Sequence, residues 1–474
     1  MGQEITQTQF NEQSFQDYRC CLFAEAELLQ SQLHEGRFSD VGEIGGYELE
    51  SWLVDHNYFP APINQRFLAS IDNPLVVPEL SLFNVELNGE PLPLRGRVFT
   101  AMAQELNLNW QSCQDVAHGM DSALMMVGIL PTIRQSDLCL ANISDSMRYR
   151  ALNEQVLLQR AGRPLHIRID GRELLDIRHP DVMLEAATTS FQIHLQSGQR
   201  NAVRYFNASL IAAGPLLAAA GNSPLLFGAD LWDETRIALF EQSVEIADES
   251  KLEDHRVSFG QDYAQASLFE CFAHNLATHP VLLPIVMNSA PQQFAHLRLH
   301  NGTIWRWVRP LIGFDADGTP HLRIEQRVLP AGPTIIDMMA NAALYFGIAR
   351  FLAGLNDAPE SKLAFCDARD NFYAAARKGL TAKMTWLDGS SIDVKTLLLE
   401  EILPMARQGL KSLNVDREDI DLYLDIMQAR IQTGQTGAVW QRTYRSKHRT
   451  DNFHLVAAYL ERQRSGAPVH EWEL

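Results

Sequence analysis

Glutamates with the spacing of metal ligands lie in short segments that are typical of β-strands. Glu48 and Glu50 follow a pair of glycines, and Glu86 lies in a second segment of alternating polar and apolar residues. Because side chains alternate across a strand, Glu48 and Glu50 share one face of it. Carboxylates that project from one sheet repel each other unless cations lie between them, and hard oxygen ligands suit Mg²⁺ or Mn²⁺. The sequence therefore predicts a site for divalent cations.

A fourth glutamate is followed by an arginine at the same spacing. Glu325 and Arg327 share one face of the predicted strand 321–329, with apolar residues on its other face. An arginine beside carboxylates that hold metal ions indicates a phosphoryl group in transit. His194, in the alternating segment 189–196, completes the set of potential metal ligands.

Each of these features also has a purely structural interpretation. A Glu-x-Glu pair on a strand is more often a solvated face than a metal site, and Glu325 with Arg327 could belong to an exposed ladder of salt bridges. A single histidine is more often hydrogen-bonded than a ligand. Glu79 lies seven residues before Glu86, so one unbroken strand would point the two to opposite faces. Either the chain bends near Pro78 or Glu79 lies outside the site.

Length, composition and charge restrict the class of protein. At 474 residues, with 46% hydrophobic and 21% charged residues, the chain is an ordinary globular protein that can bury a large core. The formal net charge of −18 argues against binding to nucleic acid or to an anionic membrane. A nucleotide substrate would therefore need local positive charge from bound metal and a few arginines. The six cysteines form no C-x-x-C pair and no zinc spacing, which predicts reduced thiols in a cytoplasmic protein.

The segments that must position these residues are strands interleaved irregularly with helices. Turn signals at residues 170–171 and 315–318 predict two hairpins. Apolar residues recur at helical spacing over residues 15–33, 98–113 and 335–354, and the pattern after residue 361 is helical without strand signals. We expect an α+β fold with a mainly antiparallel sheet.

No internal repeat and no long linker divides the chain into independent domains. The expected organisation is therefore a single catalytic domain over residues 1–474. Its core spans about residues 40–350, and a helical C-terminal region over about residues 360–474 packs on that core.

One apolar run has the length of a membrane span. Residues 208–227 carry no charge, but Gly214-Pro215 and the segment that starts at Gly221 would break a spanning helix and leave backbone groups unpaired. The sequence instead predicts a buried helix that ends at Gly221, followed by a loop, in a protein with no membrane partner.

The order of the short motifs along the chain carries more information than any one of them. The segments in question are Gly46-Tyr47-Glu48-Leu49-Glu50-Ser51-Trp52-Leu53-Val54-Asp55, Pro78-Glu79 with Asn84-Val85-Glu86-Leu87, Ser146-Met147-Arg148-Tyr149, Thr189-Ser190-Phe191-Gln192-Ile193-His194-Leu195, Gly221-Asn222-Ser223-Pro224 with Arg236, and Ile324-Glu325-Gln326-Arg327-Val328 with Asp337. In this order the sequence resembles glutamate–cysteine ligase family 2, the carboxylate–amine ligase branch. The resemblance covers roughly residues 40 to 350. The helical region that follows matches only loosely.

The resemblance implies a sheet-based ligase fold akin to that of glutamine synthetase, in which strands form a funnel-like active site around ATP and divalent metals. It implies that two or three Mg²⁺ (or Mn²⁺) ions are held by Glu48, Glu50, Glu86 and Glu325, with His194 as a further ligand. Arg327 would lie against the transferring γ-phosphoryl group, and Arg236 would bind a carboxylate of the amino-acid substrate or assist with phosphate. The residues that would line the site with less defined roles are Arg148, Tyr149, Gln192 and Asn222.

The implied activity is an ATP- and Mg²⁺-dependent ligase that joins an amino-acid carboxylate to an amine through an acyl phosphate. Glutamate and cysteine, the substrates that start glutathione biosynthesis, would be the small-molecule partners. Two other hypotheses remain open from the residues. One is a phosphotransferase that phosphorylates a carboxylate or guanidinium group with the same metal cradle, and the other is a scaffold that keeps the fold without catalysis.

One motif departs from the family pattern. Many members have a Gly-Thr-His-Pro segment where this chain has Val127-Gly128-Ile129-Leu130-Pro131, without the histidine. This leaves the amino-acid substrate, and with it the amine acceptor, open. The oligomeric state is also left open by the sequence.

Overall fold

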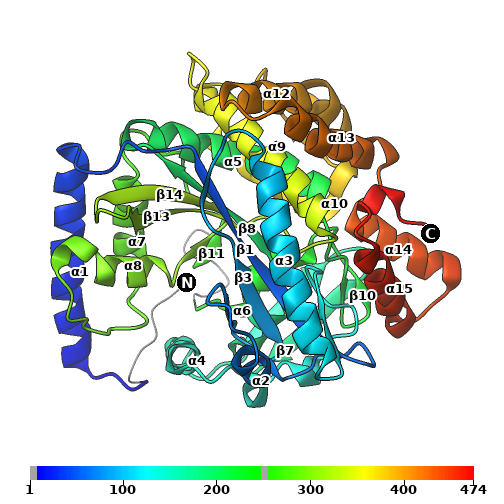
Figure 1. Cartoon of the computed structure of the whole chain (residues 1–474). Helices are drawn as coiled ribbons and strands as arrows, with labels where there is room; N and C mark the ends of the chain where they lie inside the picture. The colour runs from blue at the N-terminus through cyan, green and yellow to red at the C-terminus, as the bar shows by residue number, and fades with distance from the viewer. Residues whose placement is uncertain (1–7, 247–254) are drawn as a thin grey trace.

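The computed structural model describes residues 8–246 and 255–474. At its centre is a curled antiparallel sheet whose strands follow one another in the order β13-β14-β8-β1-β3-β2, with β4 and β5 also paired to β1 (Figure 1). The strands of this sheet are β1 Ile44–Asp55, β2 Val76–Pro78, β3 Asn84–Asn88, β4 Leu92–Pro93, β5 Ser122–Met125, β8 Phe191–Ser197, β13 Val308–Phe314 and β14 Pro320–Gln326. The expected α+β class with a mainly antiparallel sheet is confirmed.

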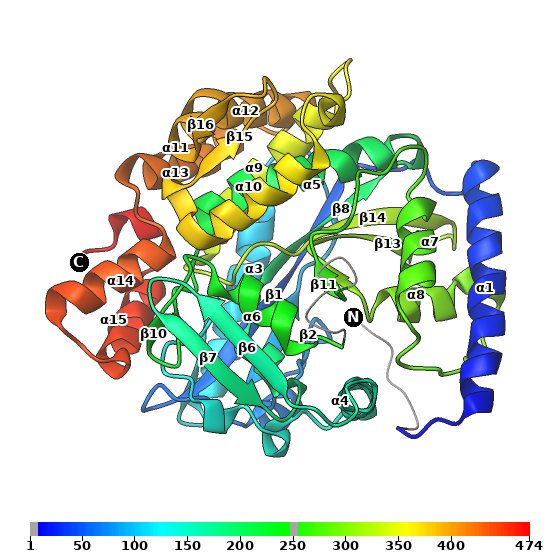
Figure 2. The same cartoon turned by 180° about the vertical axis from the view of Figure 1, so that it is seen from behind.

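Smaller strand pairs and the helices surround this sheet (Figures 1 and 2). The other strands are β6 Leu165–Asp170, β7 Leu174–His179, β9 Leu225–Leu226, β10 Ala229–Asp230, β11 Val257–Ser258, β12 Trp305–Arg306, β15 Lys383–Thr385 and β16 Ser391–Asp393. The helices are α1 Glu12–His34, α2 Asn64–Ala69, α3 Val98–His118, α4 Met147–Gln159, α5 Ala202–Ala220, α6 Thr235–Ser243, α7 Phe269–Thr278, α8 Ala295–Asn301, α9 Ile335–Ala353, α10 Phe365–Lys378, α11 Val394–Leu397, α12 Leu403–Ser412, α13 Arg417–Thr433, α14 Gly437–His448 and α15 Asn452–Ser465.

The two faces of the sheet differ in polarity because side chains alternate along each strand. One face is apolar and fully buried, with Leu49, Phe191 and Ile324 at 0% exposure. Helices α5 and α9 contact this face. Gly45 permits the close approach, since a Cβ atom there would lie 2.7 Å from the ring of Phe346 in α9. The opposite face carries the polar and charged residues that the sequence singled out.

The long apolar helices belong to the interior of the protein. The segment Gln199–Ala220 and helix α9 are apolar and long enough to cross a membrane, but 89% and 83% of their apolar windows are buried inside the fold. Such burial is typical of core helices of a soluble protein. Helix α5 is buried and ends before Gly221, as expected, and it continues through Pro215. Its neighbours bury it on all sides, and packing outweighs the lost hydrogen bond.

The C-terminal region is helical, with one departure from expectation. Strands β15 and β16 form a short hairpin within it, which the sequence did not predict because each strand has only three residues. Helices α12 and α13 pack against α9 (Figure 1). The apolar core formed by the described residues extends from Tyr18 to Trp472.

A buried ion pair fastens this region to the core. Arg430 of α13 donates to Asp337 in the first turn of α9, with a distance of 2.8 Å, and the two side chains are 1% and 0% exposed. Asp337 also accepts from the hydroxyl of Thr334 at 2.7 Å and from the backbone N–H of Val469 at 3.0 Å. The C-terminal segment thus supplies part of the hydrogen bonding that Asp337 needs as a buried carboxylate.

Candidate active site

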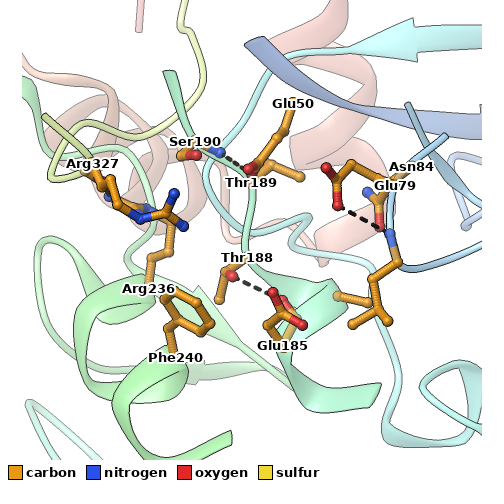
Figure 3. A pocket seen from close by; sticks show the side chains of 12 residues that line it. Glu50, Glu79, Asn84, Glu185, Thr188, Thr189, Ser190, Arg236, Phe240 and Arg327 are labelled. Atoms are coloured by element: carbon orange, nitrogen blue, oxygen red, sulfur yellow. Dashed lines mark hydrogen bonds between the residues drawn. The ribbon is translucent and has the colours of Figure 1, made fainter. Parts of the chain in front are cut away.

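A cavity of about 380 Å³ opens on the polar face of the sheet. Strands β1, β3, β8, β13 and β14 form its floor, and residues of α4 and α8 form its walls. A narrower hollow adjoins it and shares Glu50, Glu79, Glu185 and Arg327 with it (Figure 3). Together they bring residues from widely separated parts of the chain to one place.

The first group of ligand atoms consists of Glu48 and Glu325, which line this cavity, and the neighbouring His194. One ligand atom from each lies within 4.8 Å of the others. Strand pairing explains the convergence, because Glu325 lies directly opposite His194 between β14 and β8. Within the described part of the chain, neither ring nitrogen of the buried His194 has a hydrogen-bond partner, although Nε2 lies 3.2 Å from Glu48. An unsatisfied buried imidazole beside two carboxylates fits a divalent cation.

The charges around the first group favour ionised carboxylates. Burial is the largest single effect on the pKa of Glu48 and raises it, but the adjacent His194, when protonated, contributes to a net lowering of this pKa to about 2. Burial would also raise the pKa of Glu325, but Arg309 and Arg327 hold it well below its usual range. Arg309 makes a two-pronged contact with Glu325, at 2.8 and 3.1 Å. Glu325 is therefore anionic and fixed in position.

The second group of ligand atoms consists of Glu50, Glu79 and Glu86, again within 4.8 Å of one another. Glu50 and Glu86 are direct partners in the pairing of β1 with β3. Glu79 reaches them because β2 ends at Pro78, so the chain bends as one of the two sequence interpretations required. Glu79 therefore lies with the other potential ligands, which is one of the two alternatives that the sequence left open.

The positive charges near the second group do not balance the negative charge of its three carboxylates. Burial, followed by the neighbouring Glu79, raises the pKa of Glu50 to about 7, against the opposing effect of Arg327 and Arg236. Burial and then Glu48 raise the pKa of Glu86 well above its usual value. A cation held among these oxygens would relieve both effects. The donor set of three carboxylates suits Mg²⁺ or Mn²⁺.

Arg327 lies between the two groups. Its Nη1 donates to Gln192 at 2.5 Å and to Glu325 at 3.2 Å. Gln192 in turn donates to Glu50 at 2.8 Å. The amide of Gln192 therefore connects the arginine to the second group and fixes the orientation of both. Burial of Nε without a hydrogen-bond partner among the described residues leaves this guanidinium suited to an anion in the cavity.

Arg236 lies beside Arg327 in the narrower hollow (Figure 3). Its side chain is 3% exposed and donates through Nε to Glu234 at 3.1 Å and through Nη2 to the carbonyl of Val328 at 2.5 Å. These bonds fix the plane of the guanidinium at the start of α6. An arginine held in this way can receive a carboxylate with little loss of side-chain entropy.

The other sequence-predicted residues divide into two sets. Arg148 and Tyr149, in the first turn of α4, line the larger cavity together with Gln192. Asn222 lines neither hollow. Its side chain is 0% exposed and bonds with Ala331 and Tyr459, each at 2.8 Å, so the structure places it in a packing network away from the site. The loop after α5 was assigned to the site by motif order alone, and tertiary contacts turn it inward.

Sequence reasoning did not single out Arg309, which neutralises Glu325, or Glu185, which lines both hollows. Arg309 and Glu325 lie equally far from Asp317 in the predicted turn, so hairpin register could have revealed the pair. Glu185 lies in a short 3₁₀ helix, Val182–Ala187, where no periodic pattern marks it.

The comparisons with known proteins show the family and the fold of the chain. A sequence profile described as glutamate-cysteine ligase family 2 matches residues 44–458. Among curated proteins, no relative matches at a significant level of sequence similarity.

Two solved structures illustrate the shared fold. A glutamate–cysteine ligase from Francisella tularensis, in complex with AMP, is similar with a TM-score of 0.58 and 14% identity, over 90% of this chain and 90% of that chain. A bifunctional glutathione synthetase from Pasteurella multocida is similar with a TM-score of 0.54 and 10% identity, over 93% of this chain and 54% of that chain. At such identities the likeness shows the fold alone.

Proposed function

Because the chain belongs to glutamate–cysteine ligase family 2, we propose that it joins the γ-carboxylate of glutamate to the amine of cysteine at the expense of ATP. Family membership makes the chain an ATP-dependent ligase that forms an amide bond. The single observation that carries the proposal is the pair of carboxylate groups with Arg327 between them in one cavity. This arrangement suits the transfer of a phosphoryl group from ATP to a carboxylate.

The reaction needs two steps because a carboxylate has no leaving group at neutral pH. In the first, an oxygen of the substrate carboxylate attacks the γ-phosphorus of ATP, and ADP leaves. In the second, the amine nitrogen attacks the carbonyl carbon of the acyl phosphate, phosphate leaves and the nitrogen loses a proton to solvent. The chain must therefore bring an anionic nucleotide close to an anionic carboxylate and exclude water from the mixed anhydride.

Metal ions bound at the two groups of ligand atoms would overcome the repulsion between the nucleotide and the substrate carboxylate. We propose that one ion is held by Glu48, His194 and Glu325 and another by Glu50, Glu79 and Glu86, and that the bound ions neutralise phosphate oxygens and orient them.

Arg327, Arg236 and Gln192 would have the remaining roles. Arg327 would contact the equatorial oxygens of the phosphoryl group, where charge develops during transfer. Gln192 would position Arg327 through its 2.5 Å hydrogen bond. Arg236 would bind a carboxylate of the amino-acid substrate in the narrower hollow, consistent with its place among the residues that line it. In the larger cavity, Arg148 and Tyr149 would contact the nucleotide or the second substrate.

Product analysis tests the proposed substrates. The purified protein with Mg²⁺, ATP, glutamate and cysteine is expected to release ADP and phosphate and to form an amide that mass spectrometry identifies. A panel of other amino-acid pairs is the matched control. Strong turnover with a different pair would replace the proposed substrates, and a stable phosphorylated product without an amide would contradict the ligase reaction.

Metal binding is expected to stabilise the fold, and more strongly at higher pH. Burial and Glu79 raise the pKa of Glu50 to about 7 in the folded protein. Without metal, the folded protein therefore loses stability as the pH rises from the pKa of this carboxyl in the unfolded chain to its pKa in the folded protein. Mg²⁺ needs the ionised form and removes that cost. The increase in Tm on adding Mg²⁺ should therefore be larger at about pH 8 than at about pH 5.5, corresponding to on the order of 3 kcal/mol at a hundredfold excess over Kd.

The controls for this experiment separate site binding from a general salt effect. Glu48→Gln should reduce the Mg²⁺-dependent shift and abolish turnover, while the exposed Glu461→Gln should leave both as in the wild type. Equal shifts in the two variants would mean that Mg²⁺ stabilises the protein elsewhere.

A further inference from the structure

We propose that Glu185 binds the α-ammonium group of the amino acid whose carboxylate is activated, while Arg236 binds its α-carboxylate. The inference rests on the proposed function and extends it to the recognition of one substrate. It assigns a specificity-determining role to a residue that no motif in the sequence marks.

The position of Glu185 supports this role. It lies in the 3₁₀ helix Val182–Ala187, which precedes β8 and packs against α6, the helix that carries Arg236. Both side chains line the narrower hollow, and Figure 3 shows them on different sides of it. Two charged groups of opposite sign are thus fixed on packed elements around one small space.

The hydrogen-bonding state of the two residues leaves each free to accept a ligand group. In the described ranges 8–246 and 255–474, the carboxylate of Glu185 has no hydrogen bond and no ion pair, whereas its backbone carbonyl accepts from Thr188. Arg236 uses Nε and Nη2 for Glu234 and for backbone carbonyls, and its Nη1 makes no such bond within the same residues. A half-buried carboxylate facing an uncommitted guanidinium N–H is complementary to a zwitterion.

The charges around Glu185 favour a cationic ligand group. Burial, followed by Glu79 and Glu50, raises the pKa of Glu185 to about 8. A cation in contact with its oxygens would favour the ionised form. Arg327 and Arg148 exert only an electrostatic effect on Glu185 and make no direct bond with it among the described residues.

An ammonium group fits this position better than a third metal ion. Both groups of potential metal ligands found among the described residues exclude Glu185, since its oxygens do not join either cluster within 4.8 Å. One carboxylate in partial contact with solvent is a poor site for Mg²⁺, which needs several well-placed oxygens. A single ammonium needs only one strong acceptor and two weaker ones. The hydroxyls of Thr188 and Ser190 line the same hollow and can serve as weaker acceptors.

A comparison of glutamate with glutarate tests the inference, because glutarate lacks only the α-ammonium group. With saturating Mg²⁺, ATP and cysteine, Glu185→Gln should lower kcat/KM for glutamate about 100-fold, mainly through KM. The same substitution should change kcat/KM for glutarate by less than about threefold, and the KM for ATP should stay as in the wild type. Glu185→Asp should recover part of the loss, and an unchanged Tm would show that the variant folds.

Each other result has a distinct meaning. Equal losses for glutamate and glutarate would overturn the inference, because Glu185 would then act on something that both substrates share. A loss confined to the KM for cysteine would also overturn it and move Glu185 to the amine acceptor. Direct titration of the wild-type protein with glutamate, in the presence of Mg²⁺ and a non-hydrolysable ATP analogue, shows whether glutamate is bound at all. It therefore distinguishes an incorrect role for Glu185 from an incorrect donor substrate. Absent glutamate binding would overturn both the inference and the proposed donor, whereas normal binding with equal losses would overturn the inference alone.

Discussion

Replacement of Arg327 by alanine is expected to lower kcat about 10³-fold, by analogy with arginines that stabilise phosphoryl transfer in other enzymes. The guanidinium lies between the two carboxylate groups and keeps donor atoms available to an anion in the cavity. Its stabilisation should be greatest in the transition state, when charge spreads over the phosphoryl oxygens. ATP-dependent phosphate release, measured with glutamate and cysteine, gives the rate.

The fold should survive this substitution. Glu325 keeps both of its contacts with Arg309 when Arg327 is removed, so the buried carboxylate remains paired. Arg327→Lys should recover only part of the rate, because an ammonium cannot bridge Gln192 and Glu325 while it also faces the phosphoryl group. The exposed Arg200→Ala is the matched control and should keep the wild-type rate. A loss of less than about tenfold in Arg327→Ala would remove Arg327 from the transition state.

Removal of Arg430 should cost about 3–5 kcal/mol of unfolding free energy, because it leaves the carboxylate of Asp337 buried without its charge partner. Denaturant unfolding followed by tryptophan fluorescence and by circular dichroism measures this loss. We also propose that the sheet and the C-terminal helices unfold as one unit, since Arg430 and Val469 both bond to Asp337 at the start of α9. The two probes should therefore report one coincident transition.

Two further variants show whether the cost comes from an uncompensated charge. The double variant Asp337→Asn with Arg430→Met should be more stable than Arg430→Ala, because no buried charge remains. Arg407→Ala removes the more exposed contacts with Asp421 and Asp425 and should cost about 1 kcal/mol or less. Separate transitions for fluorescence and circular dichroism would contradict the single unit, and a cost for Arg430→Ala as small as for Arg407→Ala would contradict the role of the pair.

Local periodicity predicted which residues share a face but not which strands are neighbours. Alternation placed Glu48 with Glu50 and Glu325 with Arg327, and the structure has each pair on the polar face of the sheet. The convergence of Glu48, His194 and Glu325 depends on the strand order β14-β8-β1, in which neighbours in space are far apart in the chain. Such pairings are set by tertiary packing, and only the resemblance to a known family indicated them in advance.

The differences between the sequence predictions and the structure have physical causes of the same kind. Asn222 follows the long buried helix α5, and its amide is used to satisfy neighbouring groups of the core. The hairpin of β15 and β16 was missed because its strands are too short for a pattern of period two. Glu185 could not be found because a 3₁₀ turn has no hydrophobic periodicity that would assign its side chain to a face.

The contact between Val469 and Asp337 has a consequence for synthesis of the protein. The potential metal ligands all precede Asp337 in the chain, but the carboxylate at the start of α9 gains its last donor only when Val469 has emerged. The start of α9, which anchors the C-terminal helices, therefore becomes fully hydrogen-bonded only when synthesis of the described chain is nearly finished.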